Sequence, residues 1–269
     1  LQPGWAPRPP EFRTGLAFLR YNRVEALSLG GQVTQQLGRG YTAGLNARIG
    51  VGDWVPNAEL SLTRGDGRRE RAVRLFHRLA VANDDWGNPL STTASLANAL
   101  YSRDEGFYYR TWGLELAGTR AGTLGGTTRT WRLFAERQRG ATREVRGGIF
   151  GRPFEPNISA ATLTALGAGG DLARTFGEDP RRTRLLTRLR AEAAGVSGIP
   201  SLRTGALVET GWSGYGRLMG EATVSRDFGA LSAALTGGAG ALAGDAPPQR
   251  LFYVGGLQTV RGQFAAPTN

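Results

Sequence analysis

Short segments in which apolar and polar residues alternate recur along most of this 269-residue chain. In residues 42–51 every second residue is apolar, with Asn46 and Arg48 among the residues between. Residues 57–64, 107–118 and 128–139 contain the same alternation. Because successive side chains of a strand point to opposite faces, such segments predict strands with one apolar and one polar face. The sequence therefore predicts an all-β fold of antiparallel strands, about 11 or 12 in number, separated by connections rich in Gly, Asp, Asn and Pro.

Two architectures contain strands of this kind. In a transmembrane β-barrel the apolar face contacts lipid, whereas in a soluble sandwich the apolar faces pack against each other, and the alternation alone is compatible with both. The segments have roughly the 9–11 residues that a tilted membrane strand needs. One of them begins with Phe107, Tyr108 and Tyr109, which predicts an aromatic girdle at a membrane interface. No run of about 18–20 apolar residues occurs, which excludes a bundle of membrane-spanning helices.

The chain carries a formal net charge of +11, and all 33 of its basic residues are arginine. A strongly basic protein can bind nucleic acid or anionic lipid. The absence of lysine, with abundant alanine and glycine, also fits the coding bias of a GC-rich genome, in which case the charge says little about partners. Because the arginines are spread along the predicted strands and not clustered with aromatic residues, we expect no nucleic-acid partner. The lack of cysteine excludes a disulfide framework and a thiolate metal site.

Residues 83–106 interrupt the alternation. Apolar residues at helical spacing predict a short helix capped by Asn88 or Ser91, within a long extracellular loop. Asp84 and Asp85 precede this helix, and two adjacent carboxylates could bind a cation. They lack the Asp-x-Asp-x-Asp-Gly spacing of a calcium loop, so an ordinary loop role is favoured.

No motif for catalysis stands out. The chain has no Gly-x-Ser-x-Gly, no phosphate-binding loop of the Walker type and no His-Glu-x-x-His, and its acidic residues show no paired spacing. The sole histidine, His77, lies in a predicted strand, where a hydrogen-bonding role in the lumen or at the rim is favoured over catalysis. We therefore expect a protein that is not an enzyme and that binds no cofactor or metal.

Two stretches stand out from the alternating pattern. Near the end, residues 251–264 read LFYVGGLQTVRGQF, where an apolar run meets a glycine pair and Arg261 follows between an apolar residue and a glycine. Glycines allow close backbone approaches, and this setting suits an arginine whose planar fork grips a carboxylate or stacks on a ring. Near the start, residues 20–25 read RYNRVE, within a strand predicted over residues 12–33. Polar side chains there fall on both faces, as at a barrel seam or at the membrane-water rim.

The later stretch resembles the barrel of the BamA/surface-antigen superfamily of bacterial outer-membrane proteins, which includes the two-partner-secretion transporters. That superfamily carries F-x-x-G-G, a few residues and then V-R-G-F/Y on an outside loop that folds back into the barrel, with its arginine held against the inner wall. Gln263 stands where the family has an aromatic residue, and Phe264 follows one place later. The residues that match the motif are Phe252, Gly255, Gly256, Val260, Arg261 and Gly262.

The earlier stretch is similar to the first barrel strand of one group in that superfamily. These are uncharacterised outer-membrane proteins that often carry a carboxypeptidase-regulatory-like domain in front of the barrel. Their string is R-Y-N-R-V-E-G-L, and here Ala26 replaces the glycine. The residues that carry this resemblance are Arg20, Tyr21, Asn22, Arg23 and Glu25.

The resemblance implies an antiparallel transmembrane β-barrel of roughly 16 strands in the bacterial outer membrane. Residues 1–12 would be a proline-rich linker and residues 13–269 the barrel, as a fragment whose last strands follow Asn269. It also implies a protein that inserts or passes client polypeptides, with the lipid bilayer as its other partner. Two alternatives stay open, namely a structural or passive-pore barrel and a soluble basic β-protein that binds polyanions.

Overall fold

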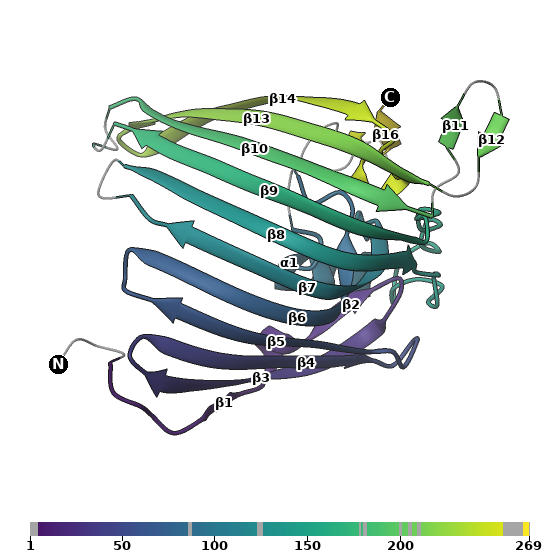
Figure 1. Cartoon of the computed structure of the whole chain (residues 1–269), viewed down its shortest axis with the longest axis horizontal. Coiled ribbons are helices and arrows are strands. Elements are labelled where there is room, and N and C mark those ends of the chain that lie inside the picture. Colours follow the sequence, from purple (N-terminus) through teal and green to yellow (C-terminus); the bar gives the residue numbers. More distant parts are fainter. Residues whose placement is uncertain are drawn as a thin grey trace.

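The structure is a computed structural model, and its dominant feature is one 12-stranded antiparallel sheet (Figure 1). The sheet order is β1-β3-β4-β5-β6-β7-β8-β9-β10-β13-β14, and β2 pairs with β3 beside β1. This confirms the all-β class and the predicted number of strands. The structure describes residues 5–85, 88–122, 126–177, 179, 182–198, 201–203, 206–208, 211–254 and 266–268.

The strands of the large sheet follow one another along the chain, so most neighbours in sequence are neighbours in space. Four short strands form two separate two-stranded sheets. One pairs β11 (Ser201–Arg203) with β12 (Ala206–Val208), and the other pairs β15 (Phe252–Val254) with β16 (Ala266–Thr268). The strands of the large sheet are β1 (Glu11–Arg13), β2 (Arg20–Asn22), β3 (Ala26–Gly38), β4 (Tyr41–Gly50), β5 (Pro56–Gly65), β6 (Arg69–Val81), β7 (Tyr108–Arg120), β8 (Thr127–Gly140), β9 (Leu163–Phe176), β10 (Arg184–Ser197), β13 (Trp212–Phe228) and β14 (Leu231–Gly244).

Little of the described chain is helical. The predicted short helix is α1 (Thr92–Tyr101), and the side chain of its N-cap residue Ser91 accepts a hydrogen bond from the backbone of Ala94 at 3.2 Å. Two single 3-10 turns, η1 (Leu16–Phe18) and η2 (Pro248–Arg250), complete the set. None of these helices combines the length and the apolar character needed to cross a membrane.

The connections between strands differ at the two ends of the sheet. At one end they include the tight turns at residues 39–40 and 229–230 and the turn at Asp66, whose carboxylate accepts from the backbone of Arg68 and Arg69 at 2.9 and 2.7 Å. At the other end three of the four connections are long, and α1, which belongs to one of them, lies behind the sheet in Figure 1. The longest of them cover residues 82–107, 141–162 and 198–211.

The outward face of the sheet is apolar and exposed. Leu45, Leu60, Leu75 and Leu114 stand directly opposite one another in a row across β4 to β7. Their side chains are 40–53% exposed, although leucine is normally buried in a soluble core. The side chains between them in each strand point to the other face, so the predicted two-faced strands are confirmed.

The buried clusters of the protein lie at the end with the long connections. One joins Val24 to Leu79 and Tyr108, and another joins Ala82 to Tyr109. Tyr108 and Tyr109 are 0% and 3% exposed, so the prediction that they form an aromatic girdle was wrong. The loops that fold over this end cover both rings, and a strand pattern carries no information about such loops.

The strand predicted over residues 12–33 is interrupted. The chain forms β1, the η1 turn and then a tight β2–β3 hairpin in which Asn22 pairs with Ala26. The Asn22 side-chain oxygen accepts from the backbone of Val24 and Glu25 at 2.9 and 2.8 Å, which closes the turn locally. RYNRVE is therefore a hairpin and not one continuous strand.

Two neighbouring strands follow β8 in the sheet. β9 covers residues 163–176 and β10 covers residues 184–197. The last part of β9 extends through the polar residues Asp171 and Arg174 to Phe176. The ladders with β8 and β10 supply partners on both sides of this extension, which outweighs its polar composition.

Candidate functional site

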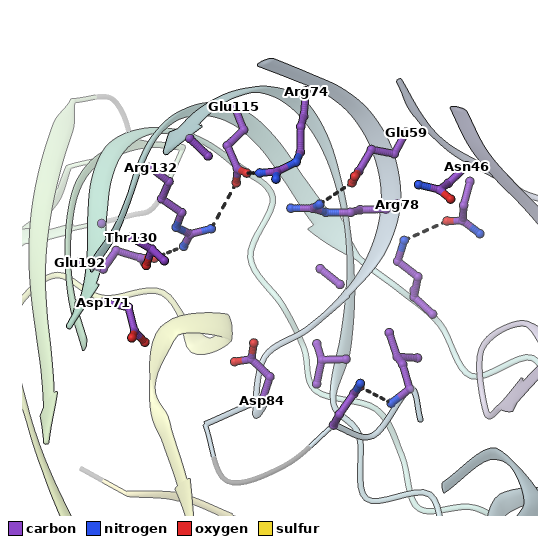
Figure 2. A pocket seen from close by; sticks show the side chains of 18 of the residues that line it. Asn46, Glu59, Arg74, Arg78, Asp84, Glu115, Thr130, Arg132, Asp171 and Glu192 are labelled. Atoms are coloured by element: carbon purple, nitrogen blue, oxygen red, sulfur yellow. Dashed lines mark hydrogen bonds and ion pairs between the residues drawn. The ribbon is translucent and has the colours of Figure 1, made fainter. Parts of the chain in front are cut away.

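The inner face of the sheet lines a cavity of about 890 Å³, and charged side chains from most of its strands point into it. We call this region the charged interior. Figure 2 shows its carboxylates and guanidinium groups pointing toward one another from successive strands. The charged interior is lined by Arg20, Glu25, Arg48, Glu59, Arg74, Arg78, Asp84, Glu115, Arg132, Asp171, Arg188, Arg190, Glu192, Arg217 and Arg250.

Ion pairs connect neighbouring strands across this face. Arg78 on β6 donates to Glu59 on β5 at 2.7 Å, and Arg74 on β6 donates to Glu115 on β7 at 2.6 Å. Arg132 on β8 lies 3.7 Å from the same Glu115 carboxylate. Arginine and glutamate side chains of β5 to β8 therefore neutralise one another across neighbouring strands. Such pairing is needed because an unpaired charge loses its hydration when it is enclosed.

Arg132 also forms an ion pair with Glu192 of β10, across the intervening strand β9. Gly169 of β9 stands directly opposite both residues in the two ladders. A Cβ atom at this position would lie 3.2 Å from Nε of Arg132, so the absence of a side chain leaves the space through which the arginine crosses. The glycine at this position of β9 therefore makes room for the ion pair between Arg132 and Glu192.

The η2 turn brings Arg250 into the same network. Its guanidinium donates to Glu136 of β8 at 2.7 Å and lies 3.4 Å from the Glu192 carboxylate. Burial works to lower the pKa of Arg250, but the adjacent Tyr109 and Glu192 outweigh it and hold that pKa well above its usual range. Arg250 is therefore positively charged at neutral pH. Beside it, the fully buried Gln249 bonds Gln138 at 2.7 Å.

Asp85 connects the loop before α1 to the opposite side of the cavity. Its side chain is 1% exposed, and it pairs with Arg190 of β10 at 3.2 Å and with Arg217 of β13. Asp84 is different, because its side chain is 61% exposed and reaches Arg190 only at 4.0 Å. The alternative of a cation site at these two residues is not supported, since two guanidinium groups already occupy the Asp85 carboxylate.

The β2–β3 hairpin inserts its first-strand motif residues beneath the long loops. Arg23 is 1% exposed, donates to the backbone oxygen of Glu155 at 2.8 Å and lies 3.4 Å from the Asp104 carboxylate. The Asp104 carboxylate also accepts from the Arg23 backbone at 2.8 Å and from the Tyr108 hydroxyl at 2.6 Å. Arg23 therefore fixes the segment after α1 and the connection between β8 and β9 to the hairpin.

The other motif residues serve the same inserted hairpin. Tyr21 donates to the backbone oxygen of Gly147 at 3.0 Å, and Glu25 accepts from Asn22 at 3.0 Å and from Asn57 on β5. Arg20 lines the cavity. All five predicted residues of this motif thus lie together, in a packing role that a single strand would not have given them.

The loop-docking motif is described only in part. Phe252 lies in β15, where the Arg217 guanidinium stacks over its ring at 4.2 Å. The ring packs against Gly240 of β14, where a Cβ atom would lie 2.5 Å from it. Outside the described residues lie Gly255, Gly256, Val260, Arg261 and Gly262.

Sequence reasoning missed Arg250, which stands just before the run that carries the loop-docking motif. Its partner carboxylates belong to strands far away in sequence, so no local spacing identifies it. The sole histidine was placed by the sequence in the lumen or at the rim. In the structure His77 is opposite the exposed Trp112 on the outward face, and its Nδ1 bonds the backbone oxygen of Pro56 at 2.7 Å.

Among the described residues, no group of three or more His, Cys, Asp or Glu side chains is arranged to hold a metal ion. What the charged interior offers instead is a polar, salt-bridged surface around a cavity. Comparison with known proteins gives no further guide, because the chain matches no protein-family model, no curated protein and no solved structure.

Proposed function

We propose that this chain forms a section of the wall of a transmembrane β-barrel in the bacterial outer membrane. One observation carries the proposal: the large apolar side chains stand exposed on one face, while the charged side chains line a cavity on the other. The row from Leu45 to Leu114 crosses four strands with no protein covering it in the described residues. A lipid environment stabilises such a surface, whereas water does not.

The soluble alternatives fit this arrangement less well. A sandwich would need a second sheet to cover the apolar face, and the other two sheets among the described residues are two-stranded. A polyanion-binding protein would need its arginines on an accessible outer surface. Many of them instead pair with carboxylates in the charged interior, as Arg74 and Arg78 do.

The connections support an orientation. Outer-membrane barrels have short periplasmic turns and longer extracellular loops, which matches the two unlike ends of this sheet. The chain enters at the short-turn end, where the backbone of Arg39 donates to the Trp5 carbonyl at 3.0 Å. In this proposal the lead-in residues therefore lie on the periplasmic side, and the loops that contain α1 face outward.

Within the membrane, we favour the role implied by the superfamily resemblance, namely the insertion or passage of client polypeptides. The inward-folded η2 turn and the inserted hairpin support a barrel with an occupied interior. The polar cavity of about 890 Å³ favours a second candidate, a passive pore. Single-channel recordings distinguish the two, because a pore conducts steadily and an occupied barrel opens only briefly.

The membrane proposal is tested by folding the chain in vesicles that contain brominated lipids. Trp112 and Trp131 stand on the outward face, so we expect bromine to quench their fluorescence and the protein to float with the vesicles. The matched control replaces both with phenylalanine and should lose most of the quenching. A protein that stays monomeric and folded in buffer without detergent, and that does not float, would contradict the proposal.

A further inference from the structure

Arg20 and Arg48 lie on either side of β3 and line the charged interior. Arg20 on β2 stands opposite Ser28, and Arg48 on β4 stands opposite Gly30. Because Ser28 and Gly30 are two residues apart on one strand, all four positions share the inner face. The two residues of β3 that stand opposite the arginines, Ser28 and Gly30, are both small.

The absence of a side chain at Gly30 shapes this place. A Cβ atom there would lie 3.2 Å from Cβ and 3.4 Å from Nε of Arg48, so the stem of Arg48 runs over the glycine. It would also lie 2.8 Å from the backbone oxygen of Ala47, which excludes a larger residue without a shift of the strand. Arg48 therefore lies against the inner face of the sheet, and its side chain lines the cavity.

These two arginines differ from the others of the charged interior. Arg74, Arg78 and Arg132 each have a carboxylate within 4 Å. Within the part of the chain that the structure describes, neither Arg20 nor Arg48 has an ion pair or a side-chain hydrogen bond, and the enclosed Nε of Arg48 has no partner.

The nearest carboxylate, Glu25, is held by two neutral donors. Its oxygens accept from the side-chain amides of Asn22 and Asn57, so Glu25 acts on the arginines only through its field. Burial, and to a smaller extent the adjacent positive charge of Arg48, lower the pKa of Arg20 to about 10. Both groups are protonated at neutral pH, and two positive charges face one carboxylate.

We propose that Arg20 and Arg48 form a binding site for a small oxyanion of the phosphate class. The planar fork of each guanidinium matches the oxygens of phosphate or sulfate, and a bound anion would supply the hydrogen-bond acceptors that both arginines lack. It would also remove the repulsion between them. The site belongs to the inner face whether or not the sheet lies in a membrane, so it does not rest on the proposed function.

Equilibrium dialysis of the folded chain with radiolabelled inorganic phosphate tests the site. We expect saturable binding that competes with sulfate and weakens at least tenfold in Arg20→Gln/Arg48→Gln. The matched control is Arg120→Gln/Arg129→Gln, which removes the same charge from an exposed pair that stands directly opposed on β7 and β8. The control should bind phosphate as the unmodified chain does.

Absence of saturable binding, or equal loss in both double variants, would overturn the proposal. If Arg20→Gln/Arg48→Gln does not fold, Arg20→Lys/Arg48→Lys decides the question, because it keeps both charges and removes the planar forks. We then expect a severalfold weaker affinity in a folded protein. Unchanged affinity in the lysine variant would show that general charge, and not this site, attracts the anion.

Discussion

Arg250 joins the η2 turn to the middle of the sheet by donating to Glu136 of β8 at 2.7 Å. The two residues are separated by more than one hundred positions in sequence, and both side chains are largely enclosed. The pair therefore fixes the chain that enters the loop-docking stretch against the inner wall. The predicted bracing role of Arg261 stays a prediction, because that residue lies outside the described residues.

Removal of the Arg250 guanidinium should destabilise the folded protein. We expect Arg250→Gln to lower the free energy of unfolding by about 3 kcal/mol, because it leaves Glu136 and Glu192 enclosed with fewer positive partners. Urea unfolding followed by tryptophan fluorescence, in the detergent that keeps the chain folded, measures the change. The control is Arg13→Gln, whose ion pair with Glu11 is exposed and should contribute nothing measurable. Equal stability of the two variants would show that Arg250 is not a brace.

Ala26 adopts a φ of 57°, in the left-handed region that favours glycine. We expect Ala26→Gly to raise the free energy of unfolding by about 1 kcal/mol, because it removes the steric cost of Cβ in this conformation. The same urea titration provides the measurement. Ala47→Gly in the ordinary backbone of β4 is the matched control and should lower stability by roughly 0.5–1 kcal/mol. A destabilised Ala26→Gly variant would mean that the hairpin turn depends on the methyl group of Ala26.

The outward face should tolerate charge in a depth-dependent way if it contacts lipid. Leu114 lies near the middle of β7, and Phe228 ends β13 beside a tight turn. We expect Leu114→Arg to reduce folding into vesicles by about 2–4 kcal/mol and Phe228→Arg by less than about 1 kcal/mol. Equilibrium folding into thin-bilayer vesicles gives both values. Similar costs at the two positions would argue against a bilayer around this face.

Asp85 should hold the loop before α1 against β10 and β13. We expect Asp85→Asn to increase hydrogen exchange of the backbone amides in residues 82–85 and 88–91 by roughly tenfold, because the substitution removes a doubly paired carboxylate. Asp84→Asn is the natural control, since its side chain makes only a distant contact with Arg190. If both substitutions act alike, the loop is held by its packing and not by the Asp85 ion pairs.

The alternation of side chains predicted most of the sheet because it is a local property. Residues such as Leu60 and Glu59 are assigned to opposite faces by their spacing alone, and the structure places them so. The hairpin at Asn22 was missed because its turn is closed by one side chain inside a polar run, with no glycine or proline to mark it. Local signals of this kind are easily hidden by a strong strand pattern.

The ion pairs of the charged interior could not be predicted from the sequence alone. Arg132 and Glu192 meet only because β8, β9 and β10 are aligned in one register, with Gly169 between them. Asp85 acquires its role from strands that lie more than one hundred residues later. The composition predicts that opposite charges will pair on this face, but the register of the paired strands determines which residues become partners.

Strand β14 pairs with β13 alone in the described residues, and its sequence is dominated by Gly, Ala and Leu. Its other side therefore offers a long row of amide and carbonyl groups, with few bulky or charged side chains to keep a second backbone away. The opposite margin is different, because β1 and β2 both lie against β3. The two edges of the sheet therefore differ. A strand from another molecule would pair with β14, and at high protein concentration the molecules should associate through this edge first.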